Sequence, residues 1–149
     1  MQDLEFEALI KEHLENLEDR ELIFLKGHLV IEQLITELLQ LSLTQPERLS
    51  SMRLMFHNKL ECYLSIDGNS IISEGLESVL KSMNSLRNKL AHSLDHPNFD
   101  QLLIEWIERA SKSRVENHND DIAVRAQLIS GISYIAAFLS GAIHAKKCT

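Results

Sequence analysis

Turn-forming residues are scarce in this chain of 149 residues, which contains only five Gly and two Pro. Because these residues mark most tight turns, their scarcity predicts few connections between long elements, and long elements favour helices over short strands. Apolar residues recur at three- and four-residue steps, the spacing of a helix that buries one face. We therefore predict an all-α protein, a compact up-and-down bundle of about five to six helices in a single domain spanning residues 1–149.

The periodic segments give the expected elements. We predict helices over about residues 3–17, 20–43, 71–94 and 99–111, another through Leu49, Met52, Phe56, Leu60 and Tyr63, and a last one containing residues 126–143. The second helix carries one apolar row (Phe24, His28, Ile31, Ile35 and Leu38) and the start of a neighbouring row (Leu25 and Leu29). A helix with so little polar surface belongs at the centre of the bundle.

The predicted connections have recognisable turn and cap residues. Thr44 and Glu47 have capping-box spacing, and Pro46 between them suits a first helical turn. Turn chemistry at residues 67–70 closes the third helix, and residues 117–120 form a loop and cap before the last one.

The overall charge and the cysteines restrict the class of protein. A net charge of −7 argues against a general nucleic-acid coat and against direct sequence-specific DNA binding. Cys62 and Cys148 have no metal-ligand spacing, so we expect reduced, incidental thiols. Residues 1–7 are acidic without an apolar run, unlike a secretion signal, so we expect a cytoplasmic protein.

The last helix contains an uncharged stretch, residues 126–143, near the lower length limit for a membrane span. Four polar residues interrupt it, and it lacks an aromatic belt, so we expect no membrane span. It carries an apolar seam (Leu128, Ile132, Ile135 and Leu139) and a small-residue face (Ser130, Ser133, Ala137 and Gly141). Close packing against another helix, within or between subunits, explains both rows.

Residues 78–94 form a positive segment in this acidic protein, with Lys81, Arg87, Lys89 and His92 and no acidic residue. Helical spacing stacks a polar row of Lys81, Ser85, Asn88 and His92 opposite the core. Arg87 lies about 140° around the helix from His92. The two side chains meet only if Arg87 reaches around the helix, if the helix breaks near residues 84–85, or if a second subunit completes the site. Ordinary surface charge is the alternative interpretation of the segment.

Other arrangements for chemistry are absent or weak. The sequence has no Gly-rich phosphate loop, nucleophile elbow or paired Cys-x-x-Cys motif. His28 and Glu32 share a helical face and could hold a metal, but we expect a hydrogen-bonded pair there instead. We therefore expect no metal and no cofactor.

The hexad Arg87-Asn88-Lys89-Leu90-Ala91-His92 resembles the signature of the HEPN superfamily, in which Arg, usually followed by a polar residue, precedes His by a short spacer. The helix at residues 27–35 is similar to the first long core helix of that superfamily. The layout of residues 22–94, roughly half the chain, resembles the mannitol operon repressor group within it.

This resemblance implies a HEPN-like helical bundle that dimerises and cleaves RNA without a metal, as many toxin and RNA-processing members do. Arg87 and His92 would be the catalytic pair, with Asn88 as the polar accompaniment that either orients His92 or caps the helix. Histidine suits acid–base work near neutral pH, and arginine holds phosphate oxygens. From charge, we add Lys89 and Lys81 as RNA contacts. Glu32 is a further potential partner of Arg87.

A non-catalytic regulatory or protein-interaction module, similar to the mannitol repressor group, is the alternative. Arg87 would then support the fold or the dimer, and His92 would be an exposed bystander. The expected partners are a second copy, RNA as substrate, and an antitoxin or another protein. An enzyme would place Arg87 and His92 around an open cleft, whereas a module would tie Arg87 to a buried carboxylate.

Overall fold

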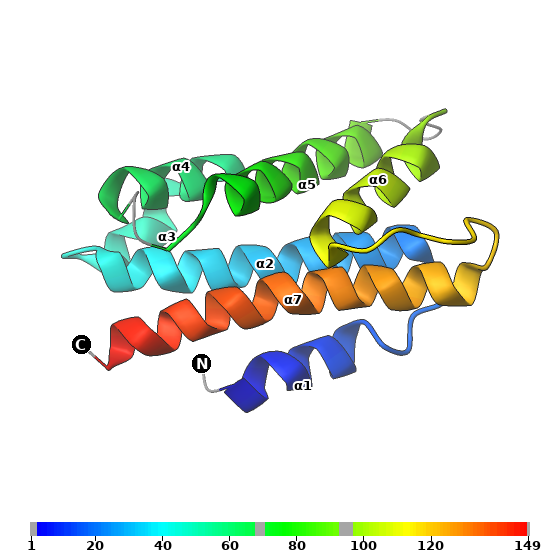
Figure 1. The fold of residues 1–149 in the computed structure, drawn as a ribbon. Coiled ribbons are helices and arrows are strands. Elements are labelled where there is room, and N and C mark those ends of the chain that lie inside the picture. Colours follow the sequence, from blue (N-terminus) through cyan, green and yellow to red (C-terminus); the bar gives the residue numbers. More distant parts are fainter. Residues whose placement is uncertain (1–2, 68–70, 93–96, 149) are drawn as a thin grey trace.

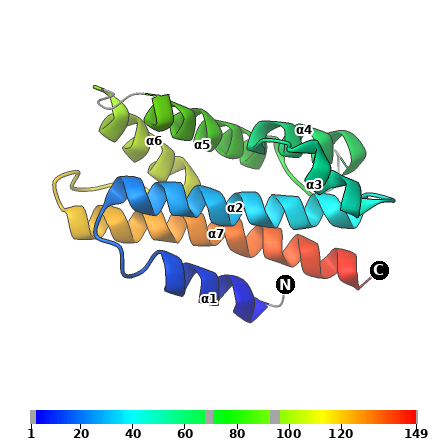
Figure 2. The same ribbon diagram turned by 180° about the vertical axis from the view of Figure 1, so that it is seen from behind.

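The computed structural model describes residues 3–67, 71–92 and 97–148, which are helical and contain no strand. The elements are α1 (Asp3–His13), α2 (Arg20–Ser42), the 3-10 turn η1 (Pro46–Arg48), α3 (Leu49–Met52), α4 (Phe56–Asp67), α5 (Glu74–His92), α6 (Phe99–Ser111) and α7 (Asp121–Lys147). Figure 1 and Figure 2 show α2 and α7 side by side at the centre, with α1 on one side and α3 to α6 on the other. The prediction of an all-α bundle is confirmed.

The two central helices run in the same direction, which departs from a strict up-and-down order. Arg20 and Asp121, at the starts of α2 and α7, form an ion pair of 2.6 Å. Lys147, at the end of α7, pairs with Glu37 in the last third of α2 at 3.0 Å. The colour sequence of both helices in Figure 1 shows the same direction.

Helix α2 is central, and most of its apolar residues are buried in the core. Asp19 caps it by accepting a hydrogen bond from the Leu22 backbone N–H at 3.0 Å. The predicted row is buried throughout (Phe24, His28, Ile31, Ile35 and Leu38). Leu29, expected in a second row, is instead 60% exposed. At Gly27 the missing side chain lets Ile132 of α7 approach the backbone closely.

Helix α7 begins at the predicted cap, where the Asp120 side chain accepts from the Ala123 N–H at 3.2 Å. Its predicted seam is buried (Leu128, Ile132, Ile135 and Leu139), while Ser130, Ala137 and Gly141 of the small-residue face are exposed. By length and composition α7 is apolar enough to cross a membrane, and 39% of that window is buried inside the protein. The seam accounts for part of this apolarity, since it packs in the core.

The predicted third helix was wrong, because the chain breaks at Arg53. Arg53 takes a left-handed conformation with φ of 51° and separates the short α3 from α4. Met52, which the prediction grouped on one helix with Phe56, Leu60 and Tyr63, is 60% exposed, whereas those three are buried. After this break, the first residue of α4, Phe56, packs against the His28 ring, with the two ring centroids 4.4 Å apart. Left-handed helix ends usually carry Gly, so an arginine there gives no sequence signal.

Other boundaries also differ from expectation. The residue that precedes η1 is Gln45, which forms no side-chain cap, so the proposed Thr44–Glu47 capping box does not start this element. Helix α1 ends at His13 instead of continuing to residue 17, and α5 begins at Glu74 instead of residue 71. The predicted turn over residues 68–70 and the helix end at residues 93–94 lie outside the described residues.

Candidate functional site

Helix α5 is anchored by its apolar face, which leaves its polar row outside. Leu80, Met83 and Leu86 are buried in the core. The Ser73 hydroxyl accepts a hydrogen bond from the Leu76 N–H at 3.2 Å and so supports the first turn. Trp106 of α6 donates its indole N–H to the Val79 carbonyl at 3.0 Å. These contacts hold the orientation of α5 about its own axis.

The polar row lines one open hollow, here called the α4–α5 hollow, of about 730 Å³. Its lining residues are His57, Lys81, Asn84, Ser85, Asn88, Lys89 and His92. All four members of the predicted row are among them, and no carboxylate is. The structure therefore brings four of the five predicted site residues to one surface: Lys81, Asn88, Lys89 and His92.

The cations of this hollow differ in how far they are neutralised. Lys81 pairs with Glu61 at 2.8 Å and with Glu77 at 2.9 Å. These two contacts, first that with Glu61 and then that with Glu77, raise the pKa of Lys81 to about 12. Lys89 and His92 are exposed and form no ion pair with another described residue. Lys89 is therefore better placed than Lys81 to meet an incoming phosphate.

Arg87, the fifth predicted residue, does not line the hollow. It is half-buried, and its guanidinium Nη1 donates to the Asn88 side-chain oxygen at 3.4 Å. Helix α5 is continuous from Glu74 to His92, so the break considered near residues 84–85 does not occur. Arg87 reaches the hollow only through Asn88, which leaves a second subunit as the other way to bring Arg87 and His92 together.

Neither expected role of Glu32 is seen. Glu32 pairs with Lys59 of α4 at 3.6 Å, and no ion pair joins it to Arg87. The His28 ring bonds to Asn84 of α5, with 3.3 Å between Nε2 and the amide oxygen, and not to Glu32. Nor do the described residues contain a group of three or more potential metal ligands.

His28 has a structural role between α2 and α5. It is 4% exposed and stacks on Phe56. Burial lowers the pKa of His28, and the charge of Arg87 lowers it further. The hydrogen bond between His28 and the Asn84 side-chain oxygen and the charge of Glu32 act in the opposite direction. A neutral imidazole can donate Nε2–H to Asn84, so this pair fixes the position of α5 against α2.

His57 and Asn84 also line the hollow, and our sequence analysis did not select them. His57 lies in the first turn of α4, and α4 packs beside α5 so that Glu61, one turn further along, meets Lys81. Only that register places His57 next to the polar row. No sequence motif identifies His57. Its position directly after Phe56, a core residue of an amphipathic helix, does indicate that the histidine side chain is exposed.

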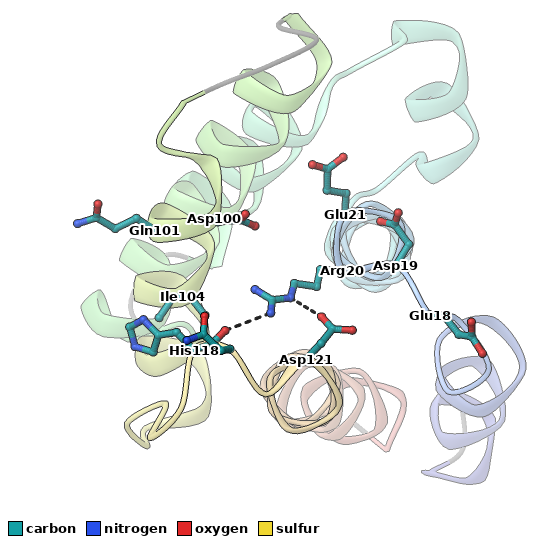
Figure 3. A pocket seen from close by; sticks show the side chains of 10 residues that line it. Glu18, Asp19, Arg20, Glu21, Asp100, Gln101, Ile104, His118 and Asp121 are labelled. Carbon is teal, nitrogen blue, oxygen red and sulfur yellow. Dashed lines mark hydrogen bonds and ion pairs between the residues drawn. The ribbon is translucent and has the colours of Figure 1, made fainter.

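A second open hollow has the opposite electrostatic character (Figure 3). It measures about 880 Å³, and its charged lining residues are Glu18, Asp19, Arg20, Glu21, Asp100 and Asp121. Figure 3 shows Arg20 directed at Asp121 and at the His118 backbone, with contacts of 2.6 and 3.3 Å. Five carboxylates against one neutralised arginine repel phosphate, so this acidic hollow is unsuited to RNA.

No protein-family model matches the sequence, and no curated protein and no solved structure matches the chain. The HEPN resemblance therefore stays a prediction, and the functional argument depends on the geometry of the site.

Proposed function

We propose that the protein is a metal-independent endoribonuclease whose active site is the α4–α5 hollow. The observation that carries this proposal is the grouping of His57, Lys89 and His92 around one open hollow that no carboxylate of the described residues lines, in a protein of net charge −7. Lys89, which forms no ion pair with another described residue, can attract a phosphate there, and both imidazoles can hydrogen-bond to it. The HEPN-like hexad, which supplies His92, supports the same assignment.

The two histidines can perform both proton transfers of RNA cleavage. One removes the proton from a ribose 2′-hydroxyl, whose oxygen attacks the adjacent phosphorus, and the other protonates the departing 5′-oxygen. The products are a 2′,3′-cyclic phosphate and a free 5′-hydroxyl. We assign His92 and His57 to this pair, with Lys89 as the cation nearest the phosphate. Asn88 accepts a hydrogen bond from Arg87 and so positions its guanidinium outside the hollow of the same protomer.

A second copy of the chain would complete the site. Since Arg87 does not line the hollow of its own protomer, we infer a homodimer in which one subunit presents Arg87 to the hollow of the other. Mixing Arg87→Ala and His92→Ala subunits tests this directly. Restored cleavage is expected because half of the sites in a mixed dimer hold one intact Arg87 and one intact His92. Mixed dimers that remain inactive would contradict the shared site.

The primary test is cleavage of mixed cellular RNA by purified protein in excess chelator. His92→Ala should lose at least about a hundredfold in rate, the usual contribution of general acid–base catalysis. His118→Ala, which removes an exposed histidine at the acidic hollow, is the matched control and should cleave normally. A 2′-deoxy nucleotide at the cleavage position should abolish the reaction. Equal rates for wild type and a folded His92→Ala variant would refute the proposal.

A non-catalytic interaction module is the second candidate, and the position of Arg87 outside the hollow favours it. No buried carboxylate holds Arg87 among the described residues, however, and His92 lies in an open hollow. The site thus meets the enzyme criterion for His92 but not for Arg87. Lack of chelator-resistant cleavage by wild type would favour the module.

A further inference from the structure

A groove on the other side of α5 has features that the proposed ribonuclease site does not use. Here called the α5–α7 groove, it measures about 530 Å³, within the usual range for small-molecule sites. Residues at the start of α5, around the end of α6 and in the middle of α7 line it, among them Leu76, Arg109, Lys112, Tyr134 and Phe138. Figure 1 shows the end of α6 reaching α7.

The groove has an apolar wall with exposed aromatic rings. Tyr134 and Phe138, one turn apart on α7, are 59% and 44% exposed. Leu76 and Val79 of α5 are half-buried residues that pack against the core and line the same groove. Two large exposed rings beside aliphatic side chains form a concave apolar surface, and such surfaces mark binding sites more often than isolated exposed residues do.

Two cations border this apolar wall. Arg109 donates to the hydroxyls of Ser78 and Ser82 at 2.6 and 2.9 Å, which are neutral acceptors. Lys112, three residues later, lies over the Tyr134 ring with its ammonium 5.2 Å from the centroid. Neither cation forms an ion pair in the described part of the chain, and the groove has no lining carboxylate. Two cations without an ion-pair partner, beside an apolar wall, are complementary to a ligand that has an anionic group attached to an apolar body.

We propose that the α5–α7 groove binds a small amphiphile with an anionic head group. The head group lies between Arg109 and Lys112, where an arginine fork and an ammonium can both donate to its oxygens. The apolar body lies along Tyr134, Phe138 and Leu76, from which it displaces water. This site is separate from the α4–α5 hollow and does not depend on RNA cleavage.

The test is calorimetric titration of the full chain with dodecanoate and dodecyl phosphate, each kept below its micelle-forming concentration. Both should bind at one site per chain, and dodecyltrimethylammonium, with the same tail and opposite charge, should not. Lys112→Gln should weaken dodecanoate binding by roughly tenfold, through loss of a charge-assisted contact. Lys11→Gln makes the same change in net charge at an exposed position of α1 that does not line the groove, and it should leave binding unaltered.

Three results would overturn this inference. The first is equal binding of the cationic amphiphile, and the second is equal weakening by Lys112→Gln and Lys11→Gln. The third is binding only to vesicles that contain anionic lipid. Phe138→Ser adds an independent check because this partly exposed side chain can change without opening the core. Phe138→Ser should weaken amphiphile binding. If the wild type instead binds no amphiphile and Phe138→Ser turns a dimer into a monomer, the groove is an interface for a second copy of the chain.

Discussion

The contact between Gly27 and Ile132 gives the sharpest prediction about what holds the two central helices together. A Cβ atom at Gly27 would overlap Cδ1 of Ile132 and stand only 3.0 Å from its Cγ1. The overlap falls on the end of the Ile132 side chain, which is fully buried among core residues. Gly27→Ala must therefore push α2 and α7 apart or force Ile132 into a poor rotamer.

The size of the effect follows from two opposing contributions. Alanine in place of glycine inside a helix stabilises by about 1 kcal/mol. Overpacking a well-filled core typically costs about 1–3 kcal/mol. Because the new Cβ would overlap a fully buried side chain, we expect a cost of about 3 kcal/mol for Gly27→Ala. We expect a net loss of roughly 2 kcal/mol in the free energy of unfolding, from the difference between these contributions. Urea unfolding followed by circular dichroism should show a lower midpoint with an unchanged slope.

Two further variants test the reasoning. Gly141→Ala is the matched control, because a Cβ at this exposed position of α7 meets no atom within 4 Å, so it should stabilise by about 1 kcal/mol. Ile132→Val removes Cδ1 and should cost about 1 kcal/mol alone, yet it should recover stability in the Gly27→Ala background. If Gly27→Ala stabilises as much as Gly141→Ala, the close α2–α7 contact is not as described.

Three other predictions concern α5 and its neighbours. Burial lowers the pKa of His28 in the folded state, so the contribution of its neutral form to stability is complete above pH 6.5. As the pH falls further, this contribution declines by up to about 1.4 kcal/mol per pH unit until the folded-state pKa is reached. His28→Gln should therefore flatten the dependence of urea midpoints on pH between pH 5 and 8. Trp106→Phe loses the bond to the Val79 carbonyl and should cost about 1 kcal/mol in the same assay. His57→Asn should remove one limb of a bell-shaped pH–rate profile for RNA cleavage, and an unchanged profile would exclude His57 from proton transfer.

Helical periodicity predicted much of the local structure correctly. The buried row of α2, the seam of α7 and the outward polar row of α5 all follow from which residues share a face at 3.6 residues per turn. The scarcity of Gly and Pro predicted long helices, and the caps at Asp120 and at the loop before it were readable from residue type. These features depend on neighbours within a few residues, so the sequence contains the information directly.

The structural surroundings of the site residues depend on how separate helices pack. His57 joins the polar row because α4 lies beside α5 in one register, and Lys81 is neutralised because that register also presents Glu61. Arg53 adopts a left-handed conformation that its residue type does not favour, which lets Phe56 reach His28. Helix patterns thus determined the class of fold and the face on which His92 lies. Tertiary structure decided which groups share that hollow and which charges stay available, because register and side-chain pairing between helices arise only when their buried faces interlock.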